Sequence, residues 1–291
     1  MRLFLTKPFA FMLIFLSCLS SQLQAKPTSI QEELAALEAQ TGARIGVSAV
    51  NTANHDTIQY RANERFAAGS TFKVMPVSMI LHQSMANKNL MMESMSYQKS
   101  DIKTWSPITE KRIDRQMTLT ELCAAAMIYS DNTAATLLLK KLGGIEAVNS
   151  FARTLNDQGF KLEPLPKNID SDPLAFNATT TPNAMQKSLQ QLALGQVLAK
   201  PEREQLVNWM KHNTTGNARI RAGVPKAWIV ADKTGSGSTY GIANDIAVVW
   251  PPQGQPLVLA IYTAFPNKEA HPRPDIVAKA TRLIIAGFNR R

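Results

Sequence analysis

The feature that most constrains the fold of this chain is the order of its strand-like and helical hydrophobic patterns. Runs rich in β-branched residues, typical of strands, occur near both ends, at 44–61 and 228–264. Between Ser70 and His212 the apolar residues recur mostly at helical spacing. The simplest fold with this order is an α/β domain made from both ends of the chain, with a helical domain inserted between them.

We place the α/β domain at residues 26–65 and 213–291 and the all-helical domain at residues 66–212, with a cleft where they meet. Within the helical part, residues 156–182 show no periodicity and contain four prolines. So long an irregular loop in a compact domain is usually functional or disordered.

Residues 1–25 have the three-part plan of a secretory signal peptide. Arg2 and Lys7 precede the apolar run 9–16, and small and polar residues follow up to Ala25. The apolar run is too short to span a membrane. We expect cleavage near Ala25 and a secreted, periplasmic protein with no membrane anchor.

Composition argues against several classes of partner. Beyond residue 25 the chain has 30 basic and 22 acidic residues, a net charge of +8, but no cluster of Lys and Arg is interleaved with aromatic residues. This argues against nucleic-acid binding. Cys123 alone cannot form an intrachain disulfide, and the four histidines lack metal-ligand spacing. We expect a monomer without metal or cofactor.

The pattern Ser-x-x-Lys occurs three times, and its context selects one copy. Ser70 and Lys73 open a nearly continuous apolar run that predicts a buried helix, on which residues three apart share a face. The other two copies lie in the polar stretch 94–103. A hydroxyl beside an amine that burial keeps partly neutral provides a nucleophile and a proton acceptor.

Two further motifs follow. Ser130-Asp131-Asn132 separates two helical runs, and Lys233-Thr234-Gly235 ends a predicted strand before a glycine-rich turn. Alone, the first is usually a helix cap and the second a strand end. Together with Ser70-Thr-Phe-Lys73, in this order, they are the signature of class A β-lactamases and penicillin-binding proteins.

The chain resembles class A serine β-lactamases over nearly all residues beyond the signal peptide. The resemblance implies an antiparallel sheet flanked by helices, an inserted helical domain and an active site between them. It also implies a hydrolase that opens β-lactam antibiotics and so confers antibiotic resistance. Further similar stretches are Asn213–Gly216, Asp232–Gly237, Tyr240–Gly241 and Asn244–Pro251.

The segments 105–108 and 217–225 are especially similar to the serine carbapenemase branch. Many class A enzymes have an arginine where Ala243 stands, and in this branch the position of Arg219 substitutes for it. Trp105 is then implied to form an aromatic wall of the cleft.

The resemblance also implies the roles of the site residues. Ser70 would be the nucleophile, and its amide and that of Ser236 would form the oxyanion hole. Lys73 would relay the proton, and Ser130 would pass it to the lactam nitrogen. Asn132 would hold the substrate's side-chain amide, whereas its carboxylate would be bound by Lys233, Thr234 and Arg219.

One part of the family's pattern is broken. Class A enzymes deacylate with a loop glutamate, and Pro166 stands at its position here. Pro164 and Ala178 replace the arginine and aspartate that normally pin the loop. Asp170 aligns with the family's water-holding asparagine, and we hypothesise that Asp170 supplies the missing carboxylate.

Several alternatives stay open. Glu163 aligns with the family's glutamate if a gap is allowed, Asp172 is a third candidate, and there could be no working base. Without a base the protein would acylate and stall as a β-lactam trap. A penicillin-binding D-Ala-D-Ala peptidase and a non-catalytic β-lactam sensor share the three motifs.

Overall fold

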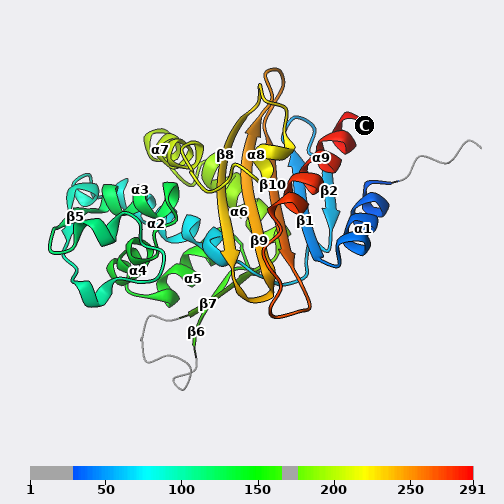
Figure 1. The fold of residues 1–291 in the computed structure, drawn as a ribbon. Helices are drawn as coiled ribbons and strands as arrows, with labels where there is room; N and C mark the ends of the chain where they lie inside the picture. The colour runs from blue at the N-terminus through cyan, green and yellow to red at the C-terminus, as the bar shows by residue number, and fades with distance from the viewer. Residues whose placement is uncertain (1–28, 166–175, 291) are drawn as a thin grey trace, which may run out of the picture.

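The computed structural model describes residues 29–165 and 176–290. Its main sheet has five antiparallel strands in the order β2-β1-β10-β9-β8, so strands from both ends of the chain lie side by side (Figure 1). This confirms the predicted α/β class with an antiparallel sheet flanked by helices. The strands are β1 (Arg44–Asn51), β2 (Thr57–Tyr60), β8 (Ile229–Gly237), β9 (Ile242–Trp250) and β10 (Leu257–Ala264).

Alternation along the strands gives the sheet two buried faces. Ala247 and Val249 of β9 belong to a core with α1 (Ile30–Thr41) and α9 (Pro274–Asn289), near the short helix α8 (Ile220–Gly223). Ile246 and Val248 belong to a second core with α6 (Pro182–Ala193), on the opposite face. Successive side chains of a strand point to opposite faces, so one strand serves both cores.

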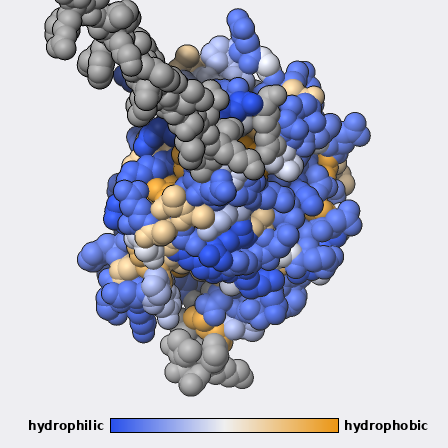
Figure 2. Space-filling model, turned by 90° about the vertical axis from the view of Figure 1, so that its right-hand side faces the viewer, coloured by the Kyte–Doolittle hydropathy of each residue, from blue (hydrophilic) through white to orange (hydrophobic). Residues whose placement is uncertain are grey.

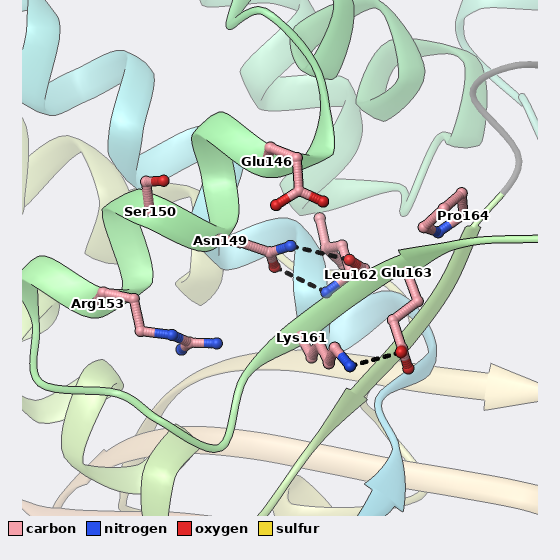
Figure 3. Close-up of a pocket in the computed structure, with 8 residues that line it drawn as sticks. All are labelled: Glu146, Asn149, Ser150, Arg153, Lys161, Leu162, Glu163 and Pro164. Carbon is pink, nitrogen blue, oxygen red and sulfur yellow. Dashed lines mark hydrogen bonds and ion pairs between the residues drawn. The ribbon is translucent and has the colours of Figure 1, made fainter.

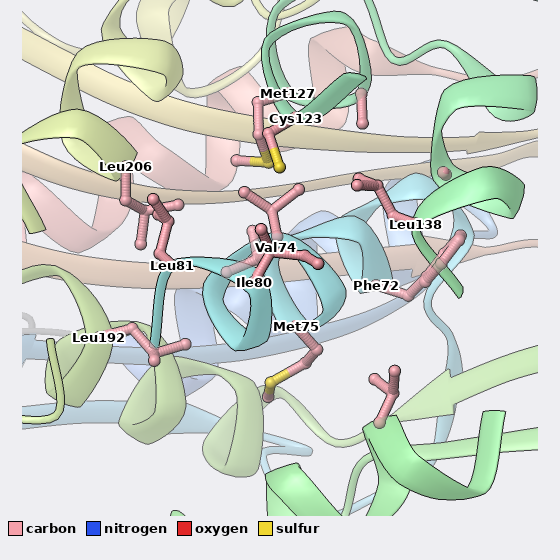
Figure 4. Close-up of a cluster of buried hydrophobic side chains, with 14 of the residues drawn as sticks. Phe72, Val74, Met75, Ile80, Leu81, Cys123, Met127, Leu138, Leu192 and Leu206 are labelled. Carbon is pink, nitrogen blue, oxygen red and sulfur yellow. The ribbon is translucent and has the colours of Figure 1, made fainter. Parts of the chain in front are cut away.

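The helical body surrounds α2 (Val74–Ser84), which is apolar on almost every side (Figure 4). A helix of that composition has to be buried over most of its surface, and its exposed residues, His82 and Gln83, lie in the last turn. The side chains of Val74, Met75 and Ile80 are fully buried there. The helices around it are α3 (Leu119–Ile128), α4 (Asn132–Lys141), α5 (Ile145–Thr154) and α7 (Lys200–Lys211), and Leu192 of α6 belongs to the same core.

Short elements connect these helices. The predicted helix start at Gly69 is a 3-10 turn, η1 (Gly69–Lys73), that leads into α2. Helix α3 starts at a capping box that Thr118 and Glu121 form. The other short elements are η2 (Leu90–Met92), β4 (Ser94–Met95), η3 (Lys99–Asp101), η4 (Thr109–Arg112), β5 (Met117–Thr118) and η5 (Thr239–Gly241).

The prediction that residues 156–182 lack regular structure is wrong for residues 161–164 and 176–180. Strands β6 (Lys161–Pro164) and β7 (Phe176–Thr180) pair with each other, and β7 also pairs with β3 (Phe66–Ala67). Strands this short leave little periodicity, and Pro164 is tolerated because it ends an edge strand. The domain boundaries remain predictions, but the segment 66–212 is not all-helical.

The predicted end of strand β8 at Lys233 is also wrong. The strand continues through the glycine-rich segment to Gly237, which lies opposite Ile242 of β9. Glycine disfavours strands in isolation, but pairing with a neighbouring strand overrides that preference.

The face that carries α1 and α9 is mostly hydrophilic, and its exposed hydrophobic residues form only small groups (Figure 2). In the two described ranges, no helix is both long and apolar enough to cross a membrane. The predicted signal peptide, residues 1–25, lies outside the described residues.

Candidate active site

A cleft of about 1110 Å³ lies where the helical body meets the edge strand β8. The predicted site residues of the described chain come together here, from both sides of the fold. Lys73 and Lys233 are fully buried. The predicted residues that line the cleft are Ser70, Trp105, Ser130, Asn132, Arg219, Thr234 and Ser236.

Close contact between two glycines positions the amide of Ser70. Gly69 has a φ of +52°, and a Cβ built on it would lie 3.0 Å from the Ser236 nitrogen. A Cβ on Gly235 would lie 3.2 Å from the Ser70 nitrogen. The turn η1 therefore abuts strand β8 directly, and the amides of Ser70 and Ser236 lie at this junction. Two fixed N–H groups beside a nucleophile suit an oxyanion.

Lys73 is held by the Ser-Asp-Asn segment. Its Nζ donates to the backbone oxygen of Ser130 and to Oδ1 of Asn132, both at 2.6 Å, and lies 3.4 Å from Ser130 Oγ. Burial lowers the pKa of Lys73 well below its usual value, and the nearby charge of Lys233 adds to this effect. A neutral amine at this position can accept a proton.

Lys233 approaches the same hydroxyl from β8. Its Nζ donates to Ser130 Oγ and to the backbone oxygen of Thr234, both at 3.0 Å. Burial lowers the pKa of Lys233 to about 7, although the charge of Asp232 opposes the shift. The Ser130 hydroxyl thus lies between two buried amines, an arrangement that can pass a proton along.

Asp131 was not predicted as a site residue, but it fixes the Ser-Asp-Asn segment. It is fully buried and caps α4 by accepting from the Ala134 amide at 2.8 Å. It also accepts from the amides of Ile108 and Thr109, at 3.0 and 2.9 Å. A cap residue between two candidate site residues was the available signal for this role.

A cation and several hydroxyls gather at one end of the cleft. The Arg219 guanidinium donates to the backbone oxygens of Asn244 and Gly235, at 2.6 and 3.0 Å, and to Ser236 Oγ. Thr215, which was missed as a site residue, pairs its Oγ1 with that of Thr234. Fixed guanidinium and hydroxyl donors suit a carboxylate.

Trp105 forms an exposed wall. Its side chain is 62% exposed, and its indole N–H donates to the Tyr129 backbone oxygen at 3.2 Å. The indole therefore does not serve ordinary core packing. Asn132 is oriented by a bond from its Nδ2 to the Thr104 backbone oxygen. Glu269 and His271 also line the cleft and were not predicted.

Glu163, the alternative candidate base, does not line this cleft. It forms an ion pair with Lys161 at 2.6 Å and lines a separate pocket of about 450 Å³ between α5 and β6 (Figure 3). This placement argues against Glu163 as the base. Pro166, Asp170 and Asp172 lie outside the described residues.

Within the described chain, no group of three or more His, Cys, Asp and Glu side chains is arranged to hold a metal ion. The cleft instead combines a serine, two buried lysines and an end lined by a guanidinium group and hydroxyls. Fold and site together define a serine hydrolase of acyl-enzyme type.

Comparison with known proteins identifies the family. The model of the "Beta-lactamase enzyme family" matches residues 29–288. Beta-lactamases CTX-M-97 and Toho-1, both from Escherichia coli, are 49% identical over 273 residues, with 92% of each chain covered. A solved β-lactamase from Desulfarculus baarsii superimposes with a TM-score of 0.83 at 44% identity, over 89% of this chain and 97% of that one.

The chain therefore belongs to the beta-lactamase enzyme family. It is a class A-like hydrolase that acts on β-lactams. The similarity to the carbapenemase branch remains a prediction.

Proposed function

We propose that this protein hydrolyses β-lactam antibiotics through an acyl-enzyme on Ser70 and so confers resistance to them. The observation that carries the proposal is the Ser130 hydroxyl, which lies 3.4 Å from Nζ of Lys73 and 3.0 Å from Nζ of Lys233 in the cleft that Ser70 lines. The reaction needs a proton moved from the attacking oxygen to the departing nitrogen, and a hydroxyl within reach of both buried amines can relay it.

The steps follow from the protonation states. Neutral Lys73 takes the proton of Ser70 as Oγ attacks the lactam carbonyl, and the amides of Ser70 and Ser236 stabilise the oxyanion. Lys73 then returns the proton through Ser130 to the lactam nitrogen as the ring C–N bond breaks. Charged Lys233 keeps the Ser130 hydroxyl oriented.

Substrate binding uses both walls of the cleft. Arg219, Thr234 and Lys233 bind the substrate carboxylate at the end of the cleft near β8. Asn132 binds the side-chain amide, and the Trp105 indole covers the ring system.

Deacylation is assigned to Asp170. Its alignment with the family's water-holding asparagine supports this role, and the ion pair of Glu163 with Lys161, away from the cleft, weakens its main rival. Asp170→Asn should leave the rate of acylation unchanged and slow deacylation at least about 100-fold, the size of effect that general bases have. The acyl-enzyme should then accumulate in intact-mass spectra, whereas the control Asp172→Asn should turn over normally. Unchanged steady turnover in Asp170→Asn would exclude this role.

One experiment tests the overall function. Purified protein is mixed with a chromogenic cephalosporin, and turnover and intact mass are followed together, with Ser70→Ala as control. Many turnovers without a lasting adduct support a hydrolase. The main alternative, a D-Ala-D-Ala peptidase or slowly deacylating trap, is favoured by Pro166 and predicts a stable one-to-one adduct.

Three further proposals concern the whole chain. Residues 1–25 are a cleaved signal peptide that directs the protein to the periplasm, and the mature protein is a monomer. N-terminal sequencing of the mature protein would test the cleavage, and gel filtration would test the oligomeric state. Turnover of a carbapenem would test the similarity to the carbapenemase branch.

A further inference from the structure

Two buried aspartates behind the cleft take no part in the proposed reaction. Asp245 of β9 lies opposite Thr234 of β8, and Asp232 precedes Thr234 by two residues. Residues two apart on a strand share a face, so the two carboxyl groups are diagonal neighbours on one face of the sheet. Both side chains are fully buried.

These aspartates bond to the segment that carries Arg219. The Ile220 amide donates to Asp245 Oδ2 at 3.1 Å, and Arg221 Nε donates to Asp232 Oδ1 at 2.6 Å. The guanidinium of Arg219 donates to the backbone oxygen of Asn244, the neighbour of Asp245, at 2.6 Å. The head of Arg219 and the amide that follows it are therefore both tied to adjacent residues of β9.

The carboxyl groups of Asp232 and Asp245 differ in the hydrogen bonds that they accept. Asp232 uses both oxygens, one for Arg221 and one for Nδ2 of Asn213. Among the described residues, Asp245 Oδ1 has no hydrogen-bond partner. Asp232 thus has the contacts of an ion pair, whereas Asp245 makes a single bond as an acceptor.

The charges around the two carboxyl groups agree with this difference between Asp232 and Asp245. Burial raises the pKa of Asp245 well above its usual value, and the charge of Asp232 adds to the effect. Arg219 and Lys233 oppose the shift. Burial and the unpartnered oxygen both favour the uncharged form of Asp245, because a buried charge without hydrogen-bond partners is costly, and its other oxygen can still accept the Ile220 N–H.

We propose that Asp245 is a positioning residue for substrate binding: as an uncharged acceptor for the Ile220 amide, it fixes the turn that aims Arg219 at the substrate carboxylate. The inference rests on the proposed role of Arg219 in binding that carboxylate. It assigns Asp245 a function through Arg219 and none in the chemical step.

The test removes the Asp245 acceptor, the Ile220 N–H donor, or only the ability of the side chain at position 245 to carry a charge. Asp245→Leu removes the acceptor, and Ile220→Pro removes the N–H at the first position of α8, together with the buried Ile220 side chain. Arg219→Ala should raise KM for a chromogenic cephalosporin about tenfold, as expected for a lost charge-assisted bond. Asp245→Leu and Ile220→Pro should each raise KM about fivefold, with kcat within about twofold, because the turn loosens rather than disappears.

Asp245→Asn retains an acceptor oxygen without a charge and should keep KM within about twofold of wild type. In the Arg219→Ala background, Asp245→Leu should add nothing to KM, because the two changes act through one contact. Val249→Ala, a buried change four residues further along β9, is the control: it lowers stability and should leave KM unchanged.

The outcomes distinguish the proposed role of Arg219 in substrate binding from the proposed role of Asp245 in positioning Arg219. If Arg219→Ala leaves KM unchanged, the proposed role of Arg219 fails, and the inference fails with it. If Arg219→Ala raises KM but neither Asp245→Leu nor Ile220→Pro does, only the inference is overturned. It is also overturned if Asp245→Asn raises KM as much as Asp245→Leu, since the charge would then matter. If Asp245→Leu does not fold, Ile220→Pro decides the same question.

Discussion

Gly235→Ala tests whether the contact between η1 and β8 builds the oxyanion hole. The new Cβ would lie 2.4 Å from the Ala68 backbone oxygen and 3.2 Å from the Ser70 nitrogen. Ordinary contact begins at 3.4 Å, so the Ala68 oxygen and the new methyl group must separate by about 1 Å. Both partners are backbone, so no side-chain rotation can relieve the clash.

We expect a displacement of about 1 Å to cost as much transition-state stabilisation as the loss of one oxyanion donor. Losing one oxyanion donor lowers kcat about 100- to 1000-fold, or about 2.7–4 kcal/mol of transition-state stabilisation. We expect a drop of this size in the acylation rate of Gly235→Ala, because the amide of Ser70 moves relative to that of Ser236. Stopped-flow measurement of single-turnover acylation with a chromogenic cephalosporin isolates this step.

Gly143→Ala is the control. Gly143 has a φ of +90°, and its Cβ would meet nothing within 4 Å, so the variant is strained without a clash. It should lose about 1 kcal/mol of stability, the usual cost of a left-handed residue other than glycine, and acylate normally. If folded Gly235→Ala acylates within about fivefold of wild type, the contact does not set the oxyanion geometry.

Two further predictions concern charge and the loop stem, as we call strands β6 and β7. Lys233 has a pKa of about 7 and is charged below it, so kcat/KM should fall as pH rises through about 7, as its hold on the substrate carboxylate weakens. Lys233→Arg should move that limb to higher pH, and an unchanged profile would exclude Lys233 as its source. Asn149→Ala removes two bonds to the Leu162 backbone and should lower the unfolding free energy by about 1–3 kcal/mol. Urea denaturation measures this loss, and equal midpoints for variant and wild type would contradict it.

The sequence supports the large elements of the fold because their signals are local. The runs of β-branched and apolar residues in β1, β9 and β10 and the helical spacing in α1 and α9 need no knowledge of distant partners. Short strands are different: β6 has four residues, and only its pairing with β7 defines it. The continuation of β8 over Gly235 likewise depends on β9.

The site residues likewise divide into those that a local motif indicates and those that only contacts in the folded chain reveal. Ser70, Ser130 and Lys233 were found because they carry recognisable motifs, although they are far apart in the chain. Asp131 and Thr215 were missed, because they contact backbone and side-chain groups that are distant in the sequence. The same holds for the contact on which the proposed role of Asp245 rests. The lowered pKa of Lys73 and of Lys233 depends on burial, which the sequence indicates only in outline.

The loop stem changes how the missing salt bridge should be interpreted. In the resemblance, Pro164 and Ala178 replace the two charged residues that normally pin the loop, and both losses together suggest a differently built loop. In the structure, Ala178 is instead paired with Leu162, and Asn149 bonds to both backbone groups of Leu162 (Figure 3).

Arg65 adds a second connection across the stem, because one of its nitrogens donates to the Gly159 backbone oxygen and to Thr179 Oγ1, both at 2.8 Å. Backbone pairing and these side-chain bonds hold both ends of the segment, so an ion pair is not needed for that purpose. The loss of the salt bridge is therefore no independent argument against turnover. The remaining argument for a trap or a peptidase is Pro166 at the position of the family's glutamate. Asp170→Asn tests whether a different carboxylate acts as the deacylation base.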